Sequence, residues 1–163
     1  MANLVTARLD MSMGWTQSHA ITGFDSIPGT GNIVAEITPT IGASDAAEVY
    51  YVQGTLAAGA SVTIDVRSLT EPAFGTALTP TGAYMILLKT SGTTWRYDPG
   101  AANPLSWFLA GTGPQINGAA GGAFGFGSTT ATTVDATTRN VRITHTGGSG
   151  TLTYTLAIVL KTA

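Results

Sequence analysis

The sequence contains no cysteine and few charged residues, and both absences narrow the functions that it can have. Without cysteine the chain has no disulfide, no thiolate zinc site and no cysteine nucleophile. Charged residues make up 10% of its 163 residues, against a usual share of about 25%. The net charge is −2, and there is no stripe of lysine and arginine. Because a basic surface is the mark of a nucleic-acid-binding protein, we expect no nucleic-acid partner.

Long apolar runs are also missing. No stretch stays apolar over the roughly 18 residues that a membrane-spanning helix needs, so we expect no membrane association. The first residues lack the basic segment and apolar run of a signal peptide. A free monomer usually carries a mixed charged surface for solubility. Two interpretations of so little charge stay open: partners cover much of the surface, or the surface is neutral threonine, serine and glycine.

What the sequence does have is the composition and the period of β-strands. Its 21 glycines are about twice the usual share of roughly 7%, and threonine is frequent throughout. Segments with alternating apolar and polar residues are separated by turns rich in glycine and proline. No helix-period segment and no linker is present. The sequence predicts a single all-β domain over residues 1–163, an antiparallel β-sandwich, jelly-roll-like, with about eight to ten strands.

Several segments carry the pattern most clearly. Val62, Ile64 and Val66 alternate with polar residues after a glycine turn at "AAGA". The segment "AYMILLKT" reads as a strand buried on both faces, and "IPGTGN" reads as a turn. Near the C-terminus, alternating runs on either side of Gly147–Gly150 predict a hairpin, with His145 on the apolar face of its first strand. The second strand places five apolar residues on one face: Leu152, Tyr154, Leu156, Ile158 and Leu160.

The N-terminal segment also alternates. Leu9, Met11 and Met13 share one face and polar residues share the other, while Ile33, Ala35, Ile37 and Ile41 form a similar face further along. Residues 1–15 are either the first strand of the chain's own sandwich or an arm that adds a strand to a neighbouring sheet.

No residue pattern indicates catalysis, a metal site or a cofactor. The two histidines, His19 and His145, lie far apart, and no Gly-x-Ser-x-Gly motif marks a nucleophile. The acidic residues are scattered, and Asp25, Asp98 and Asp135 are typical turn formers. None of the glycine-rich stretches is a phosphate-binding loop. We therefore expect no enzyme and no cofactor.

Seven aromatic residues are candidates for contacts with other molecules. They are Trp15, Tyr50, Tyr51, Trp95, Tyr97, Trp107 and Phe108. Large aromatic side chains anchor either a core or a subunit contact, and both roles are expected here. An exposed pair of Trp95 and Tyr97 would also suit carbohydrate binding, whereas base stacking lacks the accompanying basic residues.

Three segments together resemble a family of small β-rich structural proteins of tailed bacteriophages and prophages. They are "GTLAAGASVTIDVRSLTEPAFGTALTPTGAYMILLKTS" (Gly54–Ser91), "NPLSWFLAGTGPQINGAAGGAFGFG" (Asn103–Gly127) and "TVDATTRNVRITHTGGSGTLTYTLAIVL" (Thr133–Leu160). The likeness covers roughly two-thirds of the chain. It departs at "EPAFG", where the family usually has "DpfG", and at the end "LKTA", where a glycine is usual.

The resemblance implies a virion component that is assembled in the host cytoplasm. The expected function is that of a capsid decoration, or cement, protein, which binds the major capsid protein and itself, as a homotrimer, and stabilises the shell. A tail- or fibre-associated protein that binds host carbohydrate is the alternative. A hydrolase with a carboxylate pair would be a third class, but the scattered acidic residues do not favour it.

Overall fold

A computed structural model describes residues 9–19, 27–37, 46–70, 77–99, 102–105 and 115–162, with side chains from residue 48 onward. These residues form twelve strands and no helix, and every strand pairing is antiparallel. The prediction of an all-β antiparallel fold is therefore confirmed. The strand count exceeds the predicted eight to ten because the structure includes very short strands of two or three residues.

The strands divide into two four-stranded sheets and two smaller pairs. The strands are β1 (Leu9–His19), β2 (Ile27–Ile37), β3 (Ala46–Ala57), β4 (Ser61–Asp65), β5 (Leu69–Thr70), β6 (Ala77–Leu78), β7 (Pro80–Ser91), β8 (Trp95–Asp98), β9 (Ile116–Gly118), β10 (Ala123–Thr133), β11 (Asn140–His145) and β12 (Thr151–Thr162). The order β10-β7-β12-β3 forms what we call the long sheet, and β4-β11-β8-β9 forms the short sheet. The pairs β1-β2 and β5-β6 form separate two-stranded sheets.

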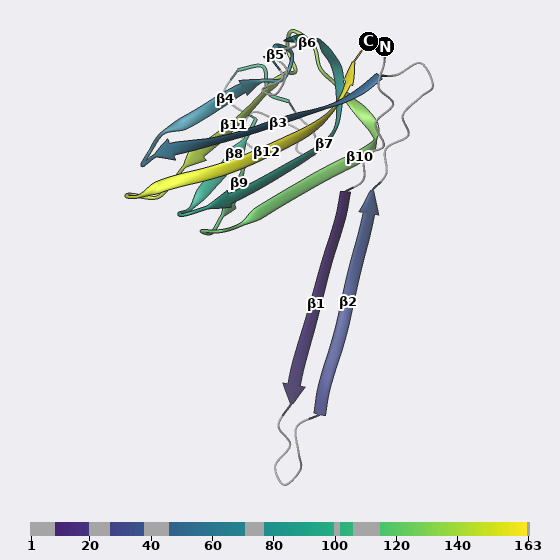
Figure 1. The fold of residues 1–163 in the computed structure, drawn as a ribbon, viewed down its shortest axis with the longest axis vertical. Helices are drawn as coiled ribbons and strands as arrows, with labels where there is room; N and C mark the ends of the chain where they lie inside the picture. The colour runs from purple at the N-terminus through teal and green to yellow at the C-terminus, as the bar shows by residue number, and fades with distance from the viewer. Residues whose placement is uncertain are drawn as a thin grey trace.

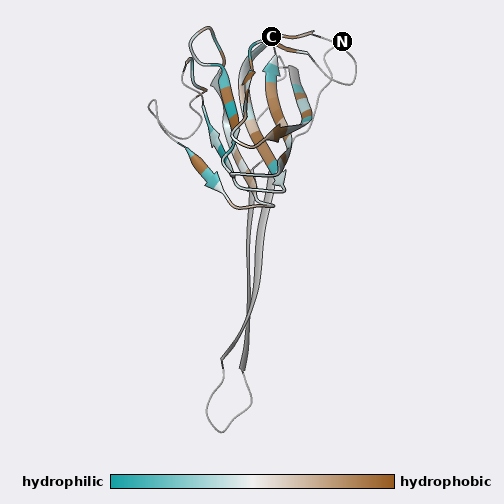
Figure 2. Ribbon diagram, turned by 90° about the vertical axis from the view of Figure 1, so that its left-hand side faces the viewer, coloured by the Kyte–Doolittle hydropathy of each residue, from teal (hydrophilic) through white to brown (hydrophobic). Residues whose placement is uncertain are grey.

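The inner faces of the two large sheets share one hydrophobic core, which makes the arrangement sandwich-like (Figure 1). Leu156 and Ile158 come from the long sheet, Val141 and Ile143 come from the short sheet, and all four are fully buried. Figure 2 shows the corresponding alternation of hydrophobic and hydrophilic bands along the strands. The predicted apolar face of β12 is confirmed, since all five of its members are buried.

The prediction of a C-terminal hairpin is wrong, although both of the predicted strands form. β11 pairs with β4 and β8 in the short sheet, whereas β12 pairs with β3 and β7 in the long sheet. The glycine-rich turn between them therefore crosses from one sheet to the other. Gly150, with φ of 82°, supplies a left-handed conformation that other residues rarely adopt. The "AAGA" turn, with Gly59 at φ of 74°, crosses between the sheets in the same way, from β3 to β4.

Two further expectations need correction. The segment "IPGTGN" was expected to be a turn, but Ile27–Asn32 forms the first half of β2 and pairs with β1. β7 was expected to be buried on both faces. This holds from Ala83 to Ile86, where Tyr84 and Met85 form a second small cluster, but Leu87 is exposed. A register shift between β7 and β12 lies within the buried part of the strand, between Ala83 and Met85.

The strands β1 and β2 form a long ribbon, which we call the β1–β2 ribbon. Eleven residue pairs join Leu9–His19 to Ile27–Ile37 without a shift in register. Figure 1 shows the ribbon extending away from the two large sheets, starting beside β10. β1 is thus paired with β2 in a two-stranded sheet rather than within the long or the short sheet.

Candidate interaction surface

The outer face of the long sheet carries a group of apolar residues, which we call the outer apolar patch: Val49, Tyr51, Leu87, Ala157 and Val159. The register places Leu87, Ala157 and Tyr51 in one row across β7, β12 and β3. Val159 and Val49 follow in the next row. Val49, Tyr51 and Leu87 are 40%, 48% and 44% exposed, the large hydrophobic residues that stand out on the described surface. A contiguous apolar patch on a sheet face is typical of an interaction site.

Polar and basic residues border the patch along the strands. The row beyond Leu87 contains Lys89, Thr155 and Gln53, and the Gln53 amide donates a hydrogen bond to the Thr155 hydroxyl at 3.3 Å. Lys161 lies on the same face near the end of β12. Among the described positions of this face there is no acidic residue. The outer face of the long sheet is therefore apolar in the middle and basic toward two of its borders.

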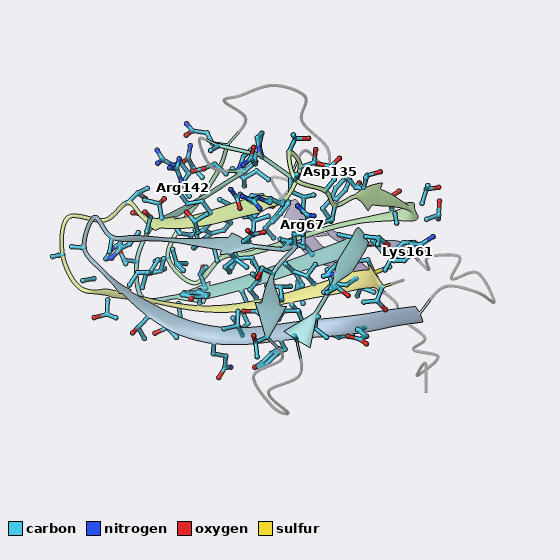
Figure 3. All side chains as sticks on the ribbon, turned by 90° about the horizontal axis from the view of Figure 1, so that it is seen from above. Arg67, Asp135, Arg142 and Lys161 are labelled. Carbon is cyan, nitrogen blue, oxygen red and sulfur yellow. The ribbon has the colours of Figure 1, made fainter. Side chains whose placement is uncertain are left out.

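The outer face of the short sheet has a different character. Asp98 lies directly opposite Arg142 in the register of β8 and β11. One carboxylate oxygen of Asp98 accepts a hydrogen bond from Arg142 Nε at 2.8 Å, and the other accepts one from Arg96 Nε at 3.1 Å. Figure 3 shows Arg142 and Asp135 on the side of the sandwich away from β3. Because the Asp98 carboxylate pairs with both arginines, this face is polar and its charged groups are paired with each other.

Tyr51 is the one predicted contact residue that the structure exposes among those with described side chains. Tyr50, Trp95 and Tyr97 are buried in the core, which corrects the expectation of an exposed Trp95/Tyr97 pair. The indole of Trp95 donates a hydrogen bond to the carbonyl oxygen of Ala119 at 3.1 Å. Tyr50 and Tyr51 differ in exposure because adjacent residues in a strand point to opposite faces. Tyr50 points into the core and Tyr51 points away from it.

The buried position of Tyr97 affects the pKa of its phenol. Burial raises the pKa of its phenol well above the usual value, and the negative charge of Asp98 adds to the rise. The ring stacks in a tilted geometry on Phe124, with centroids 5.4 Å apart. Of the other candidates, Trp15 lies in β1, where the structure describes the backbone, and Trp107 and Phe108 lie outside the described residues.

The sequence analysis missed Leu87 and Val49 as surface residues. The run of apolar letters in "AYMILL" conceals the alternation, but Lys89 follows Leu87 at a spacing of two. Residues two apart in a strand share a face, so the lysine was a signal that Leu87 lies on the solvent side. Val49 carries no comparable signal, because the residues two away from it, Ala47 and Tyr51, are apolar.

The described residues contain no arrangement that suggests catalysis. They include no group of three or more His, Cys, Asp or Glu residues that could hold a metal ion. His145 is fully buried, with its Nδ1 3.2 Å from the carbonyl oxygen of Leu56, as expected of a packed strand residue. An open hollow of about 420 Å³ beside the β7–β10 bulge is lined mainly by threonines, with Tyr84 and Lys161. It lacks the paired acid and base that hydrolysis requires.

Comparisons with known proteins do not assign the chain to a group. No family model matches the sequence, and no curated protein matches it. In the part of the chain that the structure describes, no helix is long and apolar enough to cross a membrane.

Proposed function

We propose that this protein is a structural component of a tailed-phage virion, a capsid decoration protein that binds and stabilises the shell. The observation that carries the proposal is the outer apolar patch, which lies in the middle of the outer face of the long sheet. Such a patch suits a protein that functions by binding the surfaces of other protein subunits. The resemblance of three segments to phage structural proteins points to a virion as the assembly. The proposed partners are the major capsid protein and further copies of this chain, with which it forms a homotrimer.

Capsid binding can be tested on virions of the phage whose genome carries the coding sequence. Purified particles should contain the chain in a fixed ratio to the major capsid protein, at tens to hundreds of copies. Particles that lack the gene should release their DNA at a lower temperature, because a cement protein adds buried interface area to the shell. Absence of the chain from purified particles would contradict the proposal.

Copy number also separates this function from the alternative. A tail- or fibre-associated protein would be present in a few copies and would remain with isolated tails. Trp95 and Tyr97, the pair expected to suit carbohydrate binding, are in the core, so the described residues do not favour a carbohydrate site. If a few copies are found on isolated tails and none on heads, the decoration function is wrong and the tail-associated alternative is supported.

A matched pair of variants tests whether the patch is the contact surface. Leu87→Asp places a charge in the middle of the outer apolar patch, whereas Thr63→Asp places one on β4, in the other sheet. Both positions are exposed, so both variants should fold. We expect rebinding to stripped particles to fall at least ten-fold for Leu87→Asp and to stay unchanged for Thr63→Asp. Equal binding by both variants would exclude the patch as the site.

A further inference from the structure

The four edge strands of the two large sheets differ in how well they are protected against pairing with another chain. The edges are β10 and β3 in the long sheet and β4 and β9 in the short sheet (Figure 1). A register shift between Gly127 and Thr132 distorts β10, and β4 and β9 contain only five and three residues. Bulges and short strands are common devices that prevent edge-to-edge association. Three of the four edges therefore carry one of these devices.

The strand β3 carries neither of these devices. All twelve of its residues pair with β12 without a shift in register. It contains no proline and no lysine, the residues that commonly block an edge, and Glu48 is its one charged residue. A long, regular and nearly uncharged edge is a template to which a further strand adds by main-chain hydrogen bonds.

The neighbouring strands identify the main-chain groups that β3 presents at its free side. The Thr90 N–H donates a hydrogen bond to the Gly122 carbonyl oxygen at 2.9 Å, so the main chain of Thr90 points toward β10. Residues of an antiparallel ladder bond alternately to one side and the other. The register carries this alternation across β12, where Tyr154 and Gly54 form a hydrogen-bonded pair. Even-numbered residues of β3 therefore face β12, and the odd-numbered residues from 47 to 55 point their N–H and carbonyl groups to the free side.

These free-side groups have no partner within the described chain. There, β12 is the one strand that pairs with β3. Of the main-chain hydrogen bonds outside the strand ladders of the described residues, none involves residues 47–55. The side chains of Val49 and Tyr51, which belong to the odd-numbered set, are also exposed. The edge thus offers a row of donors and acceptors that a second strand would satisfy.

We infer that β3 pairs with β3 of a second copy, antiparallel about a two-fold axis, so that two four-stranded long sheets become one continuous sheet. An edge paired with its own copy in this way is self-complementary, because the N–H groups of each chain meet the carbonyl oxygens of the other. The contact uses the main chain at the edge and leaves the outer apolar patch of each copy exposed. The inference concerns the pairing of copies and does not rest on binding to a capsid or on a trimer.

The free-side groups of β3 also set the register of this pair. They are centred on Tyr51, which places Tyr51 opposite Tyr51 of the second copy and Val49 opposite Gln53 of the second copy. Aromatic residues in facing positions stabilise neighbouring strands. Glu48 then lies opposite Gly54 of the second copy, so no like charges face each other. The odd-numbered residues of the two chains form about ten hydrogen bonds, as many as a specific interface usually contains.

Light scattering on the purified full chain tests the inference with two variants at one position. Gln53→Pro removes an N–H from the free side and leaves the bonds between β3 and β12 intact, whereas Gln53→Thr keeps the N–H. We expect an even number of copies for the parent and for Gln53→Thr: two from this contact alone, or six where three-fold contacts form as well. Gln53→Pro should have half of that mass. A monomeric or trimeric parent, or a folded Gln53→Pro variant with the parent mass, would overturn the inference.

Charges at the two-fold axis provide a second test that keeps every N–H in place. Tyr51 is exposed, so Tyr51→Lys and Tyr51→Glu should both fold. Each variant alone sets like charges opposite each other and should have half of the parent mass. An equimolar mixture sets opposite charges face to face and should recover the parent mass. Variants that keep the parent mass on their own, or a mixture that does not recover it, would contradict the inference.

Cross-linking distinguishes the edge from the outer face, because the natural chain contains no cysteine to interfere. Val49→Cys and Gln53→Cys, prepared separately, mixed and treated with a short bis-maleimide, should give a product that joins the two variants. Leu87→Cys is the control, since Leu87 lies two strands in from β3 and about 24 Å from its counterpart across the axis. If Leu87→Cys chains link to each other and the edge variants give no product, the patch pairs with itself and the inference is wrong.

Discussion

The outer faces of the two sheets both belong to antiparallel strands, but they expose different side chains to water. On the short sheet, Asp98 accepts hydrogen bonds from Arg96 and Arg142, and the face is polar. On the long sheet, Tyr51 and Leu87 lie in one row with nothing in the described chain over them. The short sheet therefore has a polar outer face of the kind that is normally exposed to solvent. The long sheet has exposed apolar residues in the middle of its outer face, and this is the face on which we propose that a partner binds.

The largest expected effect compares two leucines that lie on opposite faces of the long sheet. Leu156 is fully buried and Leu87 is exposed. Leu156→Ala should lower the free energy of unfolding by about 2–5 kcal/mol, because it removes buried contacts and leaves a cavity. Leu87→Ala should lower it by less than about 1 kcal/mol. Chemical denaturation of both variants in monomeric form measures the difference, and a similar loss for both would mean that the patch belongs to the core.

An intermediate effect is expected for the charged face. Asp98→Asn should cost about 2 kcal/mol, because Asp98 is buried and its removal leaves two arginines without a counter-charge, although water reaches about a third of each. Asp65→Asn is the control, since Asp65 is itself about a third exposed and lies 3.4 Å from Arg139. It should cost less than about 1 kcal/mol. Equal losses in thermal unfolding would show that burial of Asp98 does not strengthen its ion pairs.

The smallest effect concerns Asp135, in the turn between β10 and β11. Hydrogen bonds from the backbone N–H and hydroxyl of Thr137 and from the backbone N–H of Thr138 lower the pKa of its carboxyl below the ordinary 3.8. A lowered pKa in the folded state means that the ionised carboxylate stabilises the fold above pH 3.8. This contribution is lost as the pH falls through the folded-state pKa. Asp135→Asn should therefore lower the melting temperature slightly at pH 7 and leave it unchanged at pH 2; a constant difference across this range would contradict the assignment.

Local patterns in the sequence were sufficient to locate most strands and their buried faces. The alternation in Leu152–Leu160 and in Val141–His145 predicts which side of each strand is buried, and the structure agrees. The turn at Gly59 was predicted for the same reason, since glycine punctuates strands and accepts a left-handed conformation. At Ile27–Asn32, however, turn-forming letters lie within a strand, because pairing with β1 outweighs a weak local preference.

The candidate surface was predictable only in part. Tyr51 was selected from its residue type, but so were Trp95 and Tyr97, which the structure places in the core. Residue type says that an aromatic side chain seeks an apolar environment, and both a core and a contact provide one. Lys89, two residues after Leu87, signals that Leu87 lies on the solvent side, but only the register with β12 and β3 places it in one row with Ala157 and Tyr51.

The sequence by itself determined that this is an all-β chain without cysteine chemistry, and it determined the period that divides each strand into two faces. These properties depend on residues that are close along the chain. Only the tertiary structure decided that β11 and β12 join different sheets, that Asp98 lies between two arginines, and that Tyr51 meets Leu87 across Ala157. Each of these depends on strands distant in sequence, and an alternating pattern fits many partners equally well until the packing of the whole core selects one.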